Sequence, residues 1–263
     1  MKKNNQMQRQ NHYLHNSLRW MQKIIANPPY LSESYCTEDF ADFMRRETFL
    51  FSARYAKKNV VIHGQDKLLE ATSKSGALLT PFHYGSFFLS GGAIVHQLNL
   101  NYTAIVTGRN IAPEKSEREF WEGVHYRSSC MYENPLFYTG NTPVKTMLNF
   151  VSKPGNLLCS LLDVRETGHF PNEYLFNYLG KQIYLQTGPA RFAYLAKVPI
   201  IPMTIHYNIV EQKHHLFLGD PIHPNSNAIW VTQQAISSLE TQVTYDSAQW
   251  FFNLLNNFSS PHI

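Results

Sequence analysis

Residues 76–87 of this 263-residue chain read GALLTPFHYGSF, and this stretch decides how we interpret the fold. The apolar run at 77–82 is typical of a buried strand, and Gly85-Ser86 opens a pattern that is typical of a helix. His83 therefore falls at the carboxyl end of a strand, beside a helix amino terminus. Open α/β sheets bind ligands at this position, where helix amides attract phosphate or a developing oxyanion.

Short apolar runs alternate with helical patterns on both sides of this stretch. We expect strands at 60–63, 77–82, 102–106, 157–162, 200–206 and 216–218, and helices at 12–26, 37–58, 87–98, 144–151, 188–196 and 229–241. Thr37 is the expected N-cap of the second helix, and the first is either an interfacial or a core-packing helix. This alternation is typical of an α/β fold with a mixed, mostly parallel sheet flanked by helices. Because no linker or repeat interrupts it, we expect a flexible terminus at 1–11 and a single layered domain over 12–263.

Composition narrows the classes of partner and the compartment. The formal charge is +4 and the basic residues are scattered, which does not indicate nucleic acid but suits a phosphorylated cofactor, an acidic carrier protein or an anionic membrane surface. The three cysteines, Cys36, Cys130 and Cys159, lie far apart, and no apolar signal segment opens the chain. No stretch approaches the roughly 18 apolar residues of a membrane span. We therefore expect a cytoplasmic protein, with peripheral contact to the inner face of the cell membrane left open.

Several side chains are candidates for chemistry. His83 is one of twelve histidines, and its place at a strand end distinguishes it. Ser86 is placed to cap the following helix, but as a nucleophile it lacks the G-x-S-x-G elbow. Cys159 lies within an apolar run and is expected to pack in the core. His206 and the pair His214-His215 show no metal-binding spacing with carboxylates, so we expect no metal.

Residues 57–98 resemble the late lipid A acyltransferases, within the broader group of lysophospholipid acyltransferases. The lead VVIHGQDKLLEA at 60–71 and GALLTPFHYGSF at 76–87 are similar to the family patterns "V-x-x-x-G-x-x-x-L-x-x-A" and "G-x-x-x-L-x-x-x-H-x-G-N-W-E". Further similar blocks follow in family order at 106–109, 127, 157–163, 168–180, 186–202 and 248–250. They cover most of residues 40–252.

This resemblance implies a glycerolipid acyltransferase-like fold and transfer of an acyl group from a thioester to an amine or hydroxyl. The donor would be an acyl carrier protein or coenzyme A thioester, with no tightly bound cofactor, and the acceptor a small molecule or a lipid. His83 would act as general base, and backbone amides near Gly85 and Ser86 would stabilise the oxyanion. The expected substrate-binding residues are Tyr84, Gly85, Phe88, Arg109, Arg127 and Phe170. The two arginines would hold phosphate or carboxylate groups, and the phenylalanines the acyl chain.

The chain departs from the family at the residue five positions after the histidine. Family members have Asp or Glu there, which orients the imidazole, whereas this chain has Phe88. Three explanations stay open. Another group could orient His83, with Asp163 the best candidate, Glu133 or Glu166 behind it, and a backbone carbonyl also able to do so. Alternatively, an amine acceptor could need less help from a base, or acyl transfer could have been lost.

Two other functions on the same fold remain alternatives to acyl transfer. One is thioesterase or cyclase-like chemistry, in which water or an internal nucleophile accepts the acyl group. The other is a catalytically inactive binding homologue. The feature that favours it is Phe88, which stands where the family has its acid. The segment after Lys213 contains no Lys or Arg, which argues against an anionic lipid A acceptor and favours a smaller or less anionic one.

Overall fold

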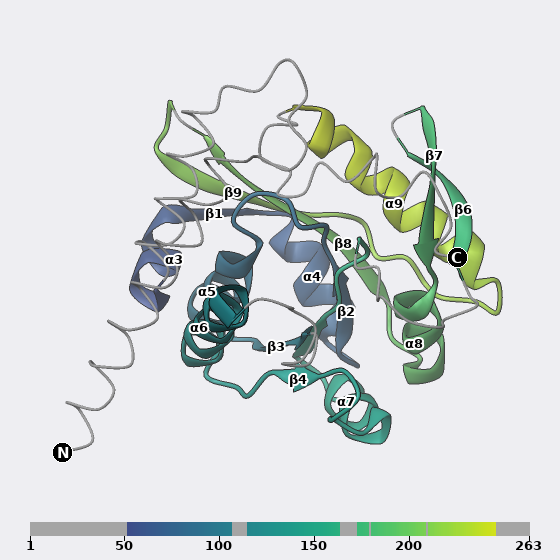
Figure 1. Ribbon diagram of the computed structural model, residues 1–263, viewed down its shortest axis with the longest axis horizontal. Helices are drawn as coiled ribbons and strands as arrows, with labels where there is room; N and C mark the ends of the chain where they lie inside the picture. The colour runs from purple at the N-terminus through teal and green to yellow at the C-terminus, as the bar shows by residue number, and fades with distance from the viewer. Residues whose placement is uncertain (1–51, 107–114, 164–172, 179, 209, 246–263) are drawn as a thin grey trace.

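The computed structural model describes residues 52–106, 115–163, 173–178, 180–208 and 210–245 (Figure 1). Its main sheet has seven strands in the spatial order β1 (Val60–His63), β9 (Lys213–Leu218), β8 (Ile200–Asn208), β2 (Ala77–Thr80), β5 (Asn156–Cys159), β3 (Asn101–Val106) and β4 (Phe137–Tyr138). Strands β8, β2, β5, β3 and β4 are parallel to one another, β9 is antiparallel to β8, and β1 is parallel to β9. This confirms the mixed, mostly parallel sheet that the sequence predicts.

Helices cover both faces of the sheet (Figure 1). On one face, a hydrophobic cluster joins the strands to α3 (Ala53–Asn59), α4 (Gln65–Thr72), α5 (Phe87–Leu98) and α6 (Lys115–Tyr132). On the other face, a second cluster joins them to α7 (Val144–Val151), α8 (Gly188–Ala196), α9 (Ala228–Tyr245) and a hairpin of β6 (Glu173–Tyr178) and β7 (Lys181–Gln186). No helix within the described ranges is long and apolar enough to cross a membrane.

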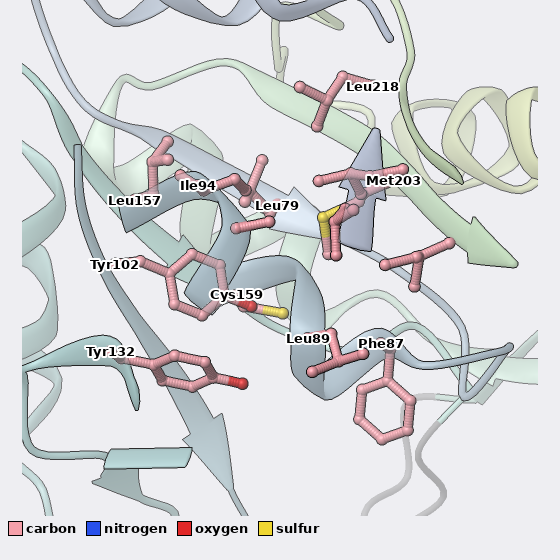
Figure 2. Close-up of a cluster of buried hydrophobic side chains, with 14 of the residues drawn as sticks. Leu79, Phe87, Leu89, Ile94, Tyr102, Tyr132, Leu157, Cys159, Met203 and Leu218 are labelled. Atoms are coloured by element: carbon pink, nitrogen blue, oxygen red, sulfur yellow. The ribbon is translucent and has the colours of Figure 1, made fainter. Parts of the chain in front are cut away.

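The central strands are buried and mostly apolar because both of their faces are covered. All four residues of β2 are buried, with Leu78 in the cluster around α9 and Leu79 in the cluster around α5. Figure 2 shows the second of these clusters, in which Leu79 and Met203 from the sheet meet Leu89 from α5. A parallel strand between two helical layers has this continuous apolar pattern, which is why the sequence predicts β2.

Most predicted elements are present, with corrections at their ends and some omissions. Helices 87–98, 144–151 and 188–196 are confirmed at both ends, and helix 229–241 extends over Ala228–Tyr245. The sequence did not predict α4, α6, β4 or the β6–β7 hairpin. Strands 77–82 and 157–162 were predicted too long, because β2 ends at Thr80 before Pro81 and β5 ends at Cys159.

Of the two predicted amino-terminal helices, the structure describes only residues from 52 onward. Ser52 has extended backbone angles and caps α3 by accepting a hydrogen bond from the Tyr55 amide, so the predicted helix 37–58 is not continuous through residue 52. The predicted helix 12–26, its alternative roles, the cap at Thr37 and the predicted flexible terminus 1–11 lie outside the described residues.

Candidate active site

The pairing of β2 with β5 brings His83 opposite Asp163. The two strands are parallel, with Leu79 paired to Cys159, and their contact continues beyond the strand ends, where the Leu162 amide donates to the Pro81 carbonyl at 3.0 Å. His83 and Asp163 each lie four residues beyond the Leu79–Cys159 pair, in the same register. Two segments that are 80 residues apart in sequence therefore place their polar side chains together at the carboxyl edge of the sheet.

Asp163 holds His83 through both its backbone and its ring. The two carboxylate oxygens accept hydrogen bonds from the His83 backbone N–H at 2.9 and 3.1 Å, and Oδ1 lies 2.8 Å from Nδ1. The Asp163 side chain is 2% exposed, whereas the imidazole is 12% exposed. A carboxylate at Nδ1 favours the tautomer with its hydrogen on that nitrogen, which makes Nε2 the basic nitrogen of the ring. Of the candidate carboxylates that the structure describes, Asp163 is the one that contacts the imidazole.

The first turn of α5 packs directly against this imidazole. The Phe87 ring contacts the His83 ring edge-on, with centroids 5.1 Å apart and an interplanar angle of 82°. Phe88, which occupies the position of the family's acid, is half-buried and lies 3.8 Å from the Phe87 ring. The amides at the start of a helix have no acceptor within the helix and carry the positive end of its dipole. Because Phe87 is the first residue of α5, the imidazole lies beside the start of this helix.

The turn between β2 and α5 is tight and cannot accept a larger residue at Gly85. Gly85 has a φ of +55°, and a Cβ atom there would overlap the Ile205 carbonyl oxygen of β8. The Tyr84 amide donates to the Phe82 carbonyl at 2.7 Å, and the Tyr84 side chain is buried in the cluster around α9. The backbone of this turn therefore packs directly against the backbone of β8.

Ser86 does not cap α5, which corrects our prediction. No side-chain capping bond is formed at this helix start, and Ser86 Oγ instead lies 2.8 Å from Nδ1 of His214 on β9. The serine is fully buried. Nε2 of His214 lies 3.3 Å from the Tyr55 hydroxyl of α3. Burial, followed by the charges of His206 and His215, lowers the pKa of His214 to about 3, so this ring is neutral at neutral pH.

The β6–β7 hairpin contributes Tyr178 to the surroundings of the site, a residue to which the sequence analysis assigned no role of its own. Tyr178, at the end of β6, packs edge-on against Phe82 with ring centroids 5.1 Å apart. Burial raises the pKa of Tyr178, and the negative charge of Asp163 raises it further. The phenol is therefore protonated and lies within the electrostatic field of the Asp163 carboxylate.

Of the remaining predicted residues, Glu133 and Arg127 are described on or next to α6, and three others are not described. Glu133 is 68% exposed and lies 3.9 Å from Nδ1 of His96, so it does not orient His83. Arg127 is half-buried on α6, and burial lowers the pKa of its guanidinium. Arg109, Glu166 and Phe170 lie outside the described residues.

The structure also locates the thiols and the other histidines. Cys159 is buried in β5, and burial raises its pKa to about 12, as expected of a packing residue, whereas Cys130 is exposed on α6. Across the ranges that the structure describes, no group of three or more His, Cys, Asp or Glu side chains is placed to hold a metal ion. A separate pair, His63 and His215, is joined by a 3.0 Å hydrogen bond and stacks beside Phe217.

The sequence matches no protein-family model and no curated protein. The similarity to acyltransferases therefore remains an expectation from short blocks of residues. The geometry at His83 does not depend on it: an imidazole bound to a buried carboxylate at the carboxyl edge of a parallel sheet is an arrangement suited to proton transfer.

Proposed function

We propose that this protein is an acyltransferase that moves an acyl group from a thioester to an amine or hydroxyl, with His83 as general base. The observation that carries the proposal is the 2.8 Å contact between His83 Nδ1 and Asp163. It supplies the carboxylate that Phe88 does not, from the segment after the neighbouring strand β5 instead of from the following helix. A buried carboxylate orients the ring and stabilises the imidazolium that forms during proton transfer.

The reaction proceeds in one displacement. His83 Nε2 takes the proton from the acceptor N–H or O–H as that atom attacks the thioester carbonyl, which forms a tetrahedral oxyanion. The intermediate collapses and breaks the carbon–sulfur bond, and the imidazolium returns its proton to the departing thiolate. The products are the amide or ester and a free thiol.

The amides at the start of α5 are the proposed donors to the oxyanion. They belong to Gly85, Ser86 and the first helical residue, Phe87, whose ring touches the imidazole. A negative charge that develops there is favoured by the helix dipole and by the backbone donors. Each such donor contributes on the order of 10²-fold or more to the rate of related reactions.

Direct transfer is favoured over a covalent intermediate because the other candidate nucleophiles are unsuited. Ser86 is fully buried, and its neighbour His214 has a pKa of about 3, which makes that ring a weak base. Cys159 is buried with a pKa of about 12, and therefore forms little thiolate at neutral pH. The acceptor itself is then the nucleophile.

The proposed donor is a coenzyme A or acyl carrier protein thioester, and the acceptor is a small molecule or a lipid of low negative charge. Thioesters of this kind occur in the cytoplasm, so we place the activity there, with access to the membrane surface for an acyl chain or lipid acceptor. The mild net charge of +4 is compatible with an acidic carrier or a phosphorylated donor.

The test uses the full chain and a panel of acyl-coenzyme A esters from butyryl to palmitoyl. Thiol release and product mass are measured with and without ethanolamine, amino acids and glycerol as acceptors. Wild-type protein should form an acylated acceptor, and His83→Ala should lower kcat by about 10² to 10⁴-fold. His63→Ala is the matched control, because it removes an imidazole from the same sheet away from the site.

Three results would contradict the proposal. Wild-type protein that cleaves no thioester in the panel would exclude this activity for these donors, and an unchanged rate in His83→Ala would remove the proposed base. Thiol release that is the same with every acceptor and with none would instead identify a thioesterase.

A further inference from the structure

We propose that Ser86 and His214 are positioning residues that hold the start of α5 beside the His83 imidazole. This inference rests on the proposed function, because it assigns the pair a role in catalysis at the same site. Neither side chain touches the reacting atoms in the proposed mechanism, to which Ser86 contributes only its backbone amide. The contact that carries the inference is the 2.8 Å hydrogen bond between Ser86 Oγ and His214 Nδ1, which is buried and joins two segments 128 residues apart.

The turn from His83 to Ser86 is held by three contacts, made by the segment after β5 and by strands β8 and β9. Asp163, which follows β5, binds the backbone N–H of His83. Gly85 lies against the Ile205 carbonyl of β8. His214 of β9 binds the side chain of Ser86. The first two contacts fix the imidazole and the middle of the turn, and the third fixes the residue from which α5 begins.

Ser86 makes this contact in place of the hydrogen bond that serine normally makes at a helix start. A serine at the N-cap position usually accepts a hydrogen bond from an amide of the first turn, which stabilises the helix by about 1 kcal/mol. Here no such bond is formed. The Ser86 hydroxyl therefore does not accept from a first-turn amide, and the Leu89 amide donates to the Ser86 carbonyl at 2.7 Å instead. The His214 contact supplies the anchoring that the missing cap would have provided.

His214 is suited to this role because it stays neutral. A neutral imidazole donates one hydrogen bond and accepts one, which matches the hydroxyl partners on its two sides, Ser86 and Tyr55. It also places no positive charge beside Ser86 at the start of α5. Burial lowers the pKa of His214 to about 3 and so maintains this state.

The two nitrogens of His214 can be tested separately. Asparagine at this position presents a polar atom close to the place of Nδ1, toward Ser86, whereas glutamine presents one close to Nε2, toward Tyr55. We therefore compare His214→Asn, His214→Gln and Ser86→Ala in the full chain, using the acyl-coenzyme A and acceptor that give the highest His83-dependent rate. His63→Asn is the control, since it breaks another imidazole pair on the opposite face of the sheet.

A positioning role predicts a particular pattern of kinetic constants. Ser86→Ala and His214→Gln should lower kcat about tenfold, the size expected for one lost buried hydrogen bond, with KM for the thioester changed less than about twofold. His214→Asn should recover most of kcat, and His63→Asn should match wild type. An unchanged kcat in Ser86→Ala, or equal losses in the two His214 variants, would overturn the inference.

Hydrogen exchange of the amides from Gly85 to Leu89 provides a second measurement that needs no substrate. These amides should exchange faster in Ser86→Ala and His214→Gln than in wild type, while exchange in α9 stays unchanged. If wild type cleaves no thioester but the exchange pattern holds, the proposed function fails and the anchoring of α5 stands. If His83→Ala abolishes activity but the Ser86 and His214 variants behave like wild type in both measurements, only the inference fails.

Discussion

Two histidines at the same edge of the sheet are bound through the same ring nitrogen at the same distance, yet their chemistry differs. His83 follows β2 and has its Nδ1 2.8 Å from the Asp163 carboxylate. His214 lies near the start of β9 and has its Nδ1 2.8 Å from the Ser86 hydroxyl. The side chain of His83 is 12% exposed, whereas His214 is 1% exposed as a residue.

The partner and the burial of an imidazole, and not its place in the sheet, therefore decide its chemistry. A carboxylate partner supports the charged ring, so His83 can accept a proton and release it. Hydroxyl partners in a buried site support the neutral ring, and burial lowers the pKa of His214 to about 3. In the proposed mechanism, one histidine therefore moves protons and the other holds structure.

Replacing Asp163, the charged partner of His83, should make His83 a much weaker general base and so more like His214. Asp163→Asn keeps the size of the side chain but removes its negative charge and one of its two acceptor oxygens, both of which bind His83. We expect kcat for acyl transfer to fall by about 10² to 10⁴-fold, measured by thiol release with the best acyl-coenzyme A. Asp220→Asn is the control, because Asp220 is 83% exposed in a surface ion pair with Lys67. Full activity in Asp163→Asn would show that the carboxylate does not orient the base.

The turn at Gly85, which lies between His83 and the Ser86 partner of His214, should tolerate very little change. Gly85→Ala would place a methyl group on the Ile205 carbonyl and hold a non-glycine residue at a φ of +55°. We expect the free energy of unfolding in guanidinium chloride to fall by about 3 kcal/mol or more, because strain and overlap add. Gly140→Ala has a φ of +76° with open space around the new atom, and should cost only about 1 kcal/mol. Similar losses in both variants would show that the turn is not packed against β8.

The sequence alone predicts much of the fold because the responsible signals are local. Strand β2 is apolar on both faces, and α5 begins where Gly85 breaks the strand pattern, so both follow from a short window. Helix α4 was missed because its eight residues bury only Leu68 and Thr72, which leaves little apolar periodicity. The β6–β7 hairpin was missed because residues 168–180 were interpreted only as a block of the family resemblance, and no strand was predicted for 181–186.

The site was predictable only in part because its contacts connect distant segments. His83 and Asp163 each stand after an apolar strand, but periodicity does not reveal that β2 and β5 are neighbours. His214 was missed because the polar run KHH at 213–215 hid the start of β9. The burial of alternate residues from Lys213 onward shows that this run follows the strand pattern, with an imidazole in place of an apolar side chain.

The neutral state of His214 should make the protein sensitive to acid. Because its pKa is lowered from 6.5 to about 3 in the folded chain, the unfolded chain binds more protons below pH 6.5, and stability falls as the pH falls. From about pH 7.5 to about pH 5.5, this group should cost wild type about 1.4 kcal/mol that His214→Asn does not lose. Guanidinium unfolding at both pH values measures the difference. Parallel losses in the two proteins would mean that His214 is protonated in the folded state.

The smallest effect is expected at the far nitrogen of His214. Tyr55→Phe removes the hydroxyl 3.3 Å from Nε2, on a half-buried side chain, but leaves the bond between Nδ1 and Ser86 in place. The free energy of unfolding should fall by about 0.5–1 kcal/mol, and kcat should stay within about twofold of wild type. If kcat instead falls as far as in Ser86→Ala, the positioning of α5 would depend on the whole path from α3 through β9. The neutral ring of His214 would then transmit the position of Tyr55 to the site, in addition to holding Ser86.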